Sequence, residues 1–168
     1  MTLYHGTTLD AWKSIFRDGL LKVASEDNSP YYNQGSKATE YGYVYLVGNA
    51  IEAVEYASVA WSAKIIGGHL SGRLLVVLEI ELPDDALELD PIDSRSKPMQ
   101  YAKGPYLRIN RNVQLDEIVR IAAFQYDNDN DVCQEVTRWI ADPNKFTEVK
   151  WLAPELHISQ WNGTGSYY

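Results

Sequence analysis

The order of the expected elements constrains the fold of this chain more than any other feature. Apolar residues at helical spacing predict a helix over residues 9–18, with Thr8 as its N-cap and Gly19 as the left-handed residue that ends it. Short apolar segments predict strands over residues 2–5, 42–47, 73–82, 106–110 and 118–124. Two early helices followed by several short strands predict an α+β domain with a split, mostly antiparallel sheet and flanking helices.

A second helix is expected directly after the strand over residues 42–47. Asn49 and Glu52 are spaced like a capping box, with Asn in the usual place of Ser or Thr. Small apolar residues, including Ala53 and Ala57, then recur on one helical face. This pattern predicts a helix with one apolar face.

Charge alternation predicts how the long strand over residues 73–82 is buried. Glu79 and Glu81 alternate with apolar residues in its second half. Because successive side chains of a strand point to opposite faces, both glutamates are expected on a solvent-exposed face.

Length and composition set the class of protein. With 168 residues, a single domain over residues 1–168 is expected. No apolar run is long enough to span a bilayer, the start Met-Thr-Leu-Tyr lacks the pattern of a secretion signal, and a single Cys133 fits a reducing compartment. We therefore expect a cytoplasmic protein with no membrane contact.

The charge balance bears on nucleic acid as a partner. The net charge is −8, and a negative surface repels phosphate backbones. The candidate for a basic groove is the cluster of Lys97, Lys103, Arg108 and Arg111, although such a cluster is more often a solvated strand face. A nucleic-acid partner is thus disfavoured but stays open.

Two motifs carry the candidate chemistry. The first short strand ends at His5 and runs into Gly6-Thr7, where a glycine lets a ligand approach the backbone. The His5 side chain can donate to a ribose hydroxyl, and the Thr7 hydroxyl can fix the His tautomer or contact the ribose. Tyr45 lies near a strand end, and Tyr56 lies eleven residues later in the second helix, where two rings could stack on a flat heteroaromatic ligand. Taken alone, each motif is more often structural: a satisfied His beside a turn, or two core tyrosines.

The two motifs together resemble the ADP-ribosyltransferase superfamily, in its branch with a His–Tyr–acid signature. Residue types, order and spacing match at His5-Gly6-Thr7, at Tyr45-Leu46 and at Tyr56. The resemblance implies that His5 and Thr7 hold the nicotinamide ribose of NAD, that Gly6 binds the carboxamide, and that Tyr45 and Tyr56 enclose the ring. It covers residues 2–124, and the C-terminal extension over residues 124–168 lies outside it.

The third signature position departs from the family. Counting back from the Val113 turn places the family's acidic residue at Gly104, Pro105 or Tyr106, none of which is acidic. In the family this acid binds the ribose 2′-hydroxyl and stabilises the oxocarbenium-like transition state. Tyr106 and Gln100 are the residues expected to replace it as hydrogen-bonding groups.

The resemblance implies an NAD-dependent mono-ADP-ribosyltransferase of a bacterial or phage effector or toxin type. NAD is then the co-substrate, nicotinamide is released, a protein is the expected acceptor, and no metal takes part. Two alternatives remain. The missing acid would suit a catalytically weak NAD- or ADP-ribose-binding module, and the basic cluster would suit a transferase that modifies nucleic acid.

The C-terminal part of the chain has a different character. Asp131 is placed to cap a helix over residues 132–141, and residues 146–151 have the pattern of a strand. A cap that faces the acceptor is the role expected for this extension.

Overall fold

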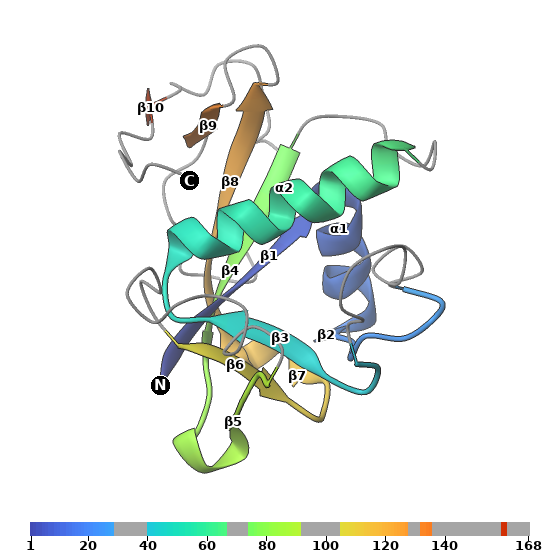
Figure 1. The fold of residues 1–168 in the computed structure, drawn as a ribbon, viewed down its shortest axis with the longest axis vertical. Helices are drawn as coiled ribbons and strands as arrows, with labels where there is room; N and C mark the ends of the chain where they lie inside the picture. Colours follow the sequence, from blue (N-terminus) through green and yellow to red (C-terminus); the bar gives the residue numbers. More distant parts are fainter. Residues whose placement is uncertain (29–39, 67–73, 92–104, 128–131, 136–158, 161–168) are drawn as a thin grey trace.

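The chain folds as an α+β domain around one large sheet (Figure 1). The computed structural model describes residues 1–28, 40–66, 74–91, 105–127, 132–135 and 159–160. Its elements are β1 (Thr2–Thr8), α1 (Leu9–Asp18), β2 (Leu20–Leu21), β3 (Val44–Val47), α2 (Ala50–Ile66), β4 (Leu74–Glu81), η1 (Asp84–Ala86), β5 (Glu88–Leu89), β6 (Tyr106–Ile109), β7 (Val113–Gln114), η2 (Leu115–Glu117), β8 (Ile118–Asp127), β9 (Val132–Glu135) and β10 (Ser159–Gln160).

The sheet is antiparallel at every strand pair of the described residues. Its strand order is β10-β9-β8-β4-β1-β3-β6-β5, and β2 pairs with β7 in a separate two-stranded sheet. The predicted α+β class with a mostly antiparallel sheet is therefore confirmed. The strands β9 and β10 continue the main sheet beyond β8, so part of the C-terminal segment belongs to the same sheet as the amino-terminal strand.

The sheet splits between β1 and β3. On one side β1 pairs with β4 over its whole length, from Thr2 opposite Glu81 to Thr8 opposite Leu75. On the other side β1 pairs with β3 at a single position, Tyr4 opposite Val47. Beyond that position the two strands leave the ladder. We call this region, residues 4–7 of β1 and 44–47 of β3, the β1–β3 junction.

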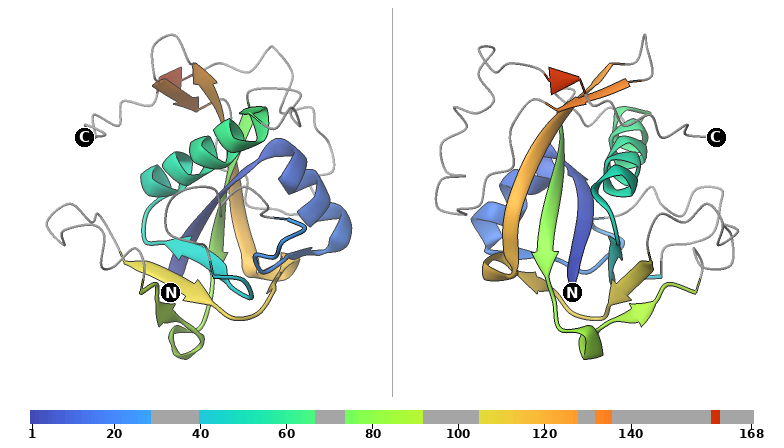
Figure 2. Two further views of the ribbon diagram at one scale, coloured as in Figure 1. Left: turned by 45° about the vertical axis from the view of Figure 1, so that its right-hand side comes forward. Right: turned by 90° about the vertical axis from the view of Figure 1, so that its left-hand side faces the viewer.

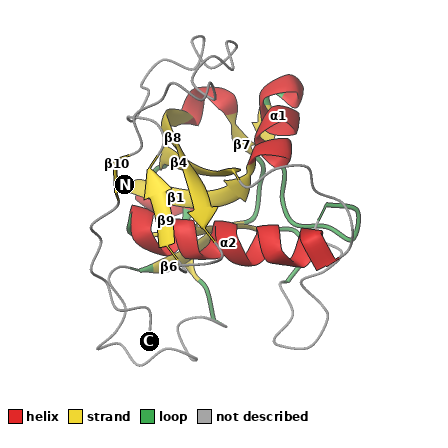
Figure 3. Cartoon of the chain, turned by 90° about the horizontal axis from the view of Figure 1, so that it is seen from above, coloured by secondary structure: helices red, strands yellow, loops and turns green. Residues whose placement is uncertain are grey.

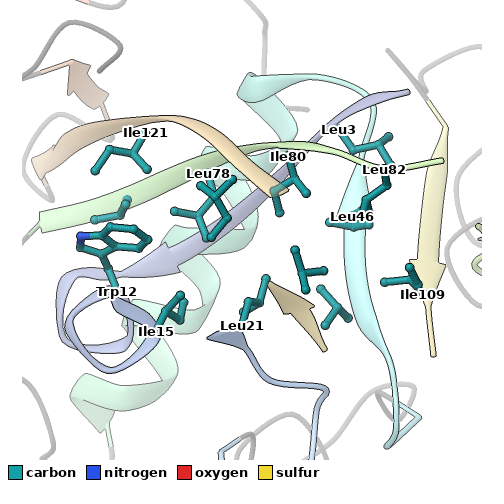
Figure 4. Close-up of a cluster of buried hydrophobic side chains, with 14 of the residues drawn as sticks. Leu3, Trp12, Ile15, Leu21, Leu46, Leu78, Ile80, Leu82, Ile109 and Ile121 are labelled. Atoms are coloured by element: carbon teal, nitrogen blue, oxygen red, sulfur yellow. The ribbon is translucent and has the colours of Figure 1, made fainter. Parts of the chain in front are cut away.

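The helices α1 and α2 cover opposite faces of the sheet. The right-hand view of Figure 2 and the view from above in Figure 3 place α1 on one side of β1, β4 and β8 and α2 on the other. Each face has its own apolar cluster. The cluster under α1 includes Trp12, Leu46, Leu78 and Ile121 (Figure 4), and the cluster under α2 includes Ala53, Ala57, Val77 and Phe124.

Local signals set both ends of α1 where the sequence predicted them. The Thr8 hydroxyl accepts a hydrogen bond from the Ala11 amide at 3.3 Å, which caps the helix. Gly19 has a φ of 74° and ends it in the left-handed conformation. The Gly19 carbonyl then accepts a hydrogen bond from Leu115, which ties the end of α1 to the β2–β7 sheet.

Gly19→Ala is expected to destabilise the protein by about 1 kcal/mol. The cost arises because a residue with a Cβ is strained at this φ, whereas the space around the new methyl group is open. Urea unfolding of both proteins measures the difference. A variant as stable as the wild type would show that the left-handed conformation at Gly19 is not required.

Two strand predictions are corrected by the structure. The first strand does not end at His5 but continues to Thr8, so Gly6 and Thr7 lie within β1 rather than in a corner after it. Glu79 is not solvent-exposed: it is buried and forms a salt bridge with Arg120 on β8. The charge alternation suggested that this face of β4 is exposed to solvent. In the structure, α2 and its apolar cluster cover it.

The predicted helix over residues 132–141 is wrong at its start. Residues 132–135 form β9, which pairs with β8 from Phe124 opposite Glu135 to Asp127 opposite Val132. An open sheet edge at β8 supplies backbone partners, and pairing with it overrides a local capping signal. The predicted strand over residues 146–151 lies outside the described residues.

Candidate functional site

His5 and Tyr45 meet at the β1–β3 junction. The Nδ1 atom of His5 lies 2.9 Å from the backbone carbonyl oxygen of Tyr45. The contact lies just past Tyr4, where the backbone ladder between the two strands stops. The His5 side chain therefore bridges the two strands at the point where backbone pairing ends.

This contact fixes the tautomer of His5. A carbonyl oxygen can only accept a hydrogen bond, so Nδ1 must carry the proton. Burial lowers the pKa of His5, and the hydrogen bond to Tyr45 raises it by less. The ring is consequently neutral at neutral pH, and its Nε2 atom has a lone pair. The sequence interpretation used His5 as a donor to a ribose hydroxyl, whereas in this tautomer Nε2 accepts from one.

The lowered pKa of His5 predicts how stability depends on pH. Below about pH 6.5, the ordinary His value, the unfolded chain binds a proton that the folded protein still refuses. Stability is therefore unaffected above that pH and is lost as the pH falls from there toward the lowered pKa of the folded state. Unfolding of the wild type and of His5→Asn at a series of pH values measures this. Parallel curves for the two proteins would contradict the lowered pKa.

Gly6 is required by the packing of α2. A Cβ atom built on Gly6 would lie 1.7 Å from the Ala53 carbonyl oxygen and 2.9 Å from the Ala57 amide nitrogen. The sequence interpretation explained this glycine by the close approach of a ligand. In the structure, the backbone of α2 occupies the side of Gly6 from which a Cβ would project. Thr7 is buried beside it in β1.

The side chain of Tyr45 is held by the segment that precedes β3. Its hydroxyl donates to the Glu40 carbonyl oxygen at 3.0 Å and accepts from the Glu40 amide at 2.8 Å. Burial raises the pKa of Tyr45, so the phenol keeps its proton at neutral pH. These bonds fix the orientation of the ring at the junction.

Arg108 lies opposite Tyr45 on β6 and is almost fully buried. Its guanidinium binds Glu40 at 2.6 Å and Glu88 at 3.3 Å, and its Cζ lies 3.9 Å from the centroid of the Tyr43 ring. Burial acts to lower the pKa of Arg108, but the two carboxylates outweigh it and raise the pKa. Arg108 thus forms, with Glu40 and Glu88, a group of paired charges beside Tyr45.

Tyr106, one of the two expected replacements for the acid, is buried and bound to a carboxylate. Its hydroxyl donates to Glu52 Oε2 at 2.6 Å. Its ring also meets the Tyr56 ring edge-on, with centroids 6.4 Å apart and planes at 74°. The structure therefore brings two sequence-predicted site residues, Tyr56 and Tyr106, into direct ring contact. It also adds to Tyr106 a glutamate, Glu52, that sequence reasoning did not assign to the site.

Sequence reasoning missed Glu52 as a site residue because its place in the capping box of α2 already accounted for a glutamate there. The Asn49 side chain accepts from the Glu52 amide at 2.9 Å, so the predicted cap of α2 is present. The Glu52 carboxylate, however, reaches across to Tyr106 on β6. The position of Glu52 in the first helical turn, on the side of the helix that faces the sheet, was the signal that could have found it.

The basic cluster offers little to a nucleic acid in the part that the structure describes. Arg108 is buried between two carboxylates, and Arg111 forms a two-pronged salt bridge with Glu117. Lys97 and Lys103, like Gln100, lie outside the described residues. The two arginines are thus neutralised by partners within the chain.

The comparisons with known proteins add no functional information. No family model matches the chain, and no curated protein matches it. Protein CC0527 from Caulobacter crescentus, and a double mutant of it, align with 15% sequence identity over 80% of this chain and 94% of theirs, with a TM-score of 0.43. So loose a likeness carries no argument. Within the described residues, no helix is long and apolar enough to cross a membrane.

Proposed function

We propose that this protein is an NAD-dependent mono-ADP-ribosyltransferase whose site lies at the β1–β3 junction. The observation that carries the proposal is the hydrogen bond from His5 Nδ1 to the Tyr45 carbonyl oxygen. It joins the two motifs that resemble the ADP-ribosyltransferase superfamily and orients a neutral imidazole whose Nε2 can accept from a ribose hydroxyl.

The proposed reaction transfers ADP-ribose from NAD to a nucleophile. The bond between C1′ of the ribose and the nicotinamide nitrogen breaks, and its electron pair leaves with nicotinamide. A lone pair of the acceptor forms the new bond at C1′, and the acceptor gives up one proton to solvent. His5 would hold the ribose, the Gly6 backbone the carboxamide, and Tyr45 and Tyr56 the ring.

A protein acceptor fits the charge of the chain better than a nucleic acid. The net charge is −8, and both described arginines of the basic cluster are paired with glutamates. A nucleic-acid acceptor would need cations that contact phosphates. We place the reaction in the cytoplasm, because a single Cys133 fits a reducing compartment.

A binding module without turnover is the second candidate, because none of Gly104, Pro105 and Tyr106, where the family places its acid, is acidic. NAD would then bind at the same junction and stabilise the fold, and a partner protein would bind the NAD-bound form.

Transfer of labelled ADP-ribose separates these functions. The protein is incubated with NAD labelled in the adenosine half, together with a mixture of proteins, with RNA or with DNA oligonucleotides. Label on protein supports the proposal. Label on an oligonucleotide, lost steeply with added salt, supports a nucleic-acid acceptor. A rise in melting temperature with NAD but no label on any acceptor and no free nicotinamide supports the binding module.

A further inference from the structure

The described part of the chain contains a buried carboxylate on the α2 side of the β1–β3 junction. Glu52 lies in the first turn of α2 and is 8% exposed, and Tyr106 at the start of β6 is 5% exposed. The two are joined by the 2.6 Å hydrogen bond from the Tyr106 hydroxyl. A buried carboxylate usually has a structural partner or a function, because removing it from water is costly.

The sheet register places this pair beside both candidate rings. Tyr106 lies opposite Val47, and Arg108 lies opposite Tyr45. Residues two apart on a strand share a face, so Tyr45 and Tyr106 are diagonal neighbours, typically about 7–8 Å apart. The Tyr106 ring also contacts Tyr56 from α2. Tyr106 is therefore a neighbour of both tyrosines assigned to the nicotinamide ring, of Tyr45 across the sheet and of Tyr56 by ring contact.

We propose that Glu52, acting through Tyr106, supplies the negative charge that the site needs in place of an acid at the start of β6. This inference rests on the proposed function. When the C1′–nicotinamide bond breaks, positive charge develops on the ribose, and an oriented negative group lowers the energy of that state. The Tyr106 hydroxyl gives its proton to the hydrogen bond with Glu52, so its oxygen is the more electron-rich and accepts from a ribose hydroxyl. No proton is transferred in this step.

The helix favours a carboxylate at this position. Glu52 is in the first turn of α2, where the helix dipole is positive and stabilises negative charge. Asn49 caps the same turn through the Glu52 amide and fixes the backbone from which the carboxylate extends. Tyr106 is the group that would touch the substrate, and Glu52 is a positioning residue that acts on it.

Four variants test this role by nicotinamide release from NAD, with kcat and KM measured separately. Glu52→Gln keeps an oxygen that can accept from Tyr106 but removes the charge. Tyr106→Phe keeps the ring packing on Tyr56 but removes the hydroxyl. The double variant combines both. Glu79→Gln is the control, since Glu79 is a buried carboxylate of β4 that forms a salt bridge with Arg120.

We expect Glu52→Gln and Tyr106→Phe each to lower kcat by about 100-fold, the lower end of the range found for groups that stabilise transition-state charge. The KM for NAD should change little, because the effect is confined to the transition state. The double variant should be no slower than the slower single variant, because one residue acts through the other. Melting temperatures show whether each variant is folded.

Three results would overturn the inference. In the first, Glu52→Gln keeps the wild-type kcat while His5→Ala loses activity, so that the proposed function stands and Glu52 has no part in it. In the second, Glu79→Gln loses as much activity as Glu52→Gln, which marks a general effect of buried charge. In the third, the wild type releases no nicotinamide, and the proposed function fails together with the role of Glu52.

Discussion

Gly6→Ala is expected to unfold the protein or to destabilise it by at least about 4 kcal/mol, an exceptional value for one methyl group. The new Cβ would lie 1.7 Å from the Ala53 carbonyl oxygen and 2.7 Å from its carbonyl carbon. Both are backbone atoms of α2, so no change of rotamer relieves the clash. The helix α2 must move away from β1, and the apolar cluster between them is opened.

Urea unfolding of Gly6→Ala beside Gly19→Ala measures this effect. Gly19 is the matched control because it receives the same methyl group in open space, where the cost is backbone strain alone. The clash at Gly6 should make its variant several kcal/mol less stable than the Gly19 variant. Equal stability of the two variants would mean that α2 does not pack on β1 at the distance described.

His5→Ala and His5→Asn are expected to lower nicotinamide release from NAD at least about 100-fold, the order of effect seen when a positioned polar group of an active site is removed. The two variants separate the two nitrogen atoms. The Asn side chain amide can replace Nδ1 as donor to the Tyr45 carbonyl oxygen, but it has no counterpart of Nε2. Ala removes both functions.

The stability of the two His5 variants distinguishes catalysis from architecture. His5→Asn should melt close to the wild type, because the bridge between β1 and β3 is kept. His5→Ala should melt lower, because the Tyr45 carbonyl oxygen loses its donor at the junction. If His5→Asn retained full activity, the role assigned to Nε2 would be wrong even though the bridge is real.

The parts of the fold that the sequence predicted well are those that depend on neighbours along the chain. Both ends of α1 follow from Thr8 and Gly19, whose effects act within one helical turn. The burial of Glu79 could not be predicted from alternation along β4, because it depends on α2 packing over that face and on Arg120 from β8. The start of β9 was misjudged for the same reason: its partner is the edge of β8.

The candidate site divides in the same way. His5 and Tyr45 were identified as motif residues, and the structure brings them into contact. Tyr56 and Tyr106 are also brought together, but by a contact between α2 and β6 that no local pattern in the sequence reveals. Glu52 was assigned to a helix cap, and its contact with Tyr106, 54 positions along the chain, is visible only in three dimensions.

The central claim is that the β1–β3 junction binds NAD and cleaves its nicotinamide bond. Nicotinamide release by the purified wild-type protein, measured against His5→Asn under the same conditions, tests it most directly. The account predicts steady release by the wild type and almost none by the variant. Absence of release by the wild type, together with no change in its melting temperature on addition of NAD, would contradict both turnover and binding at the junction.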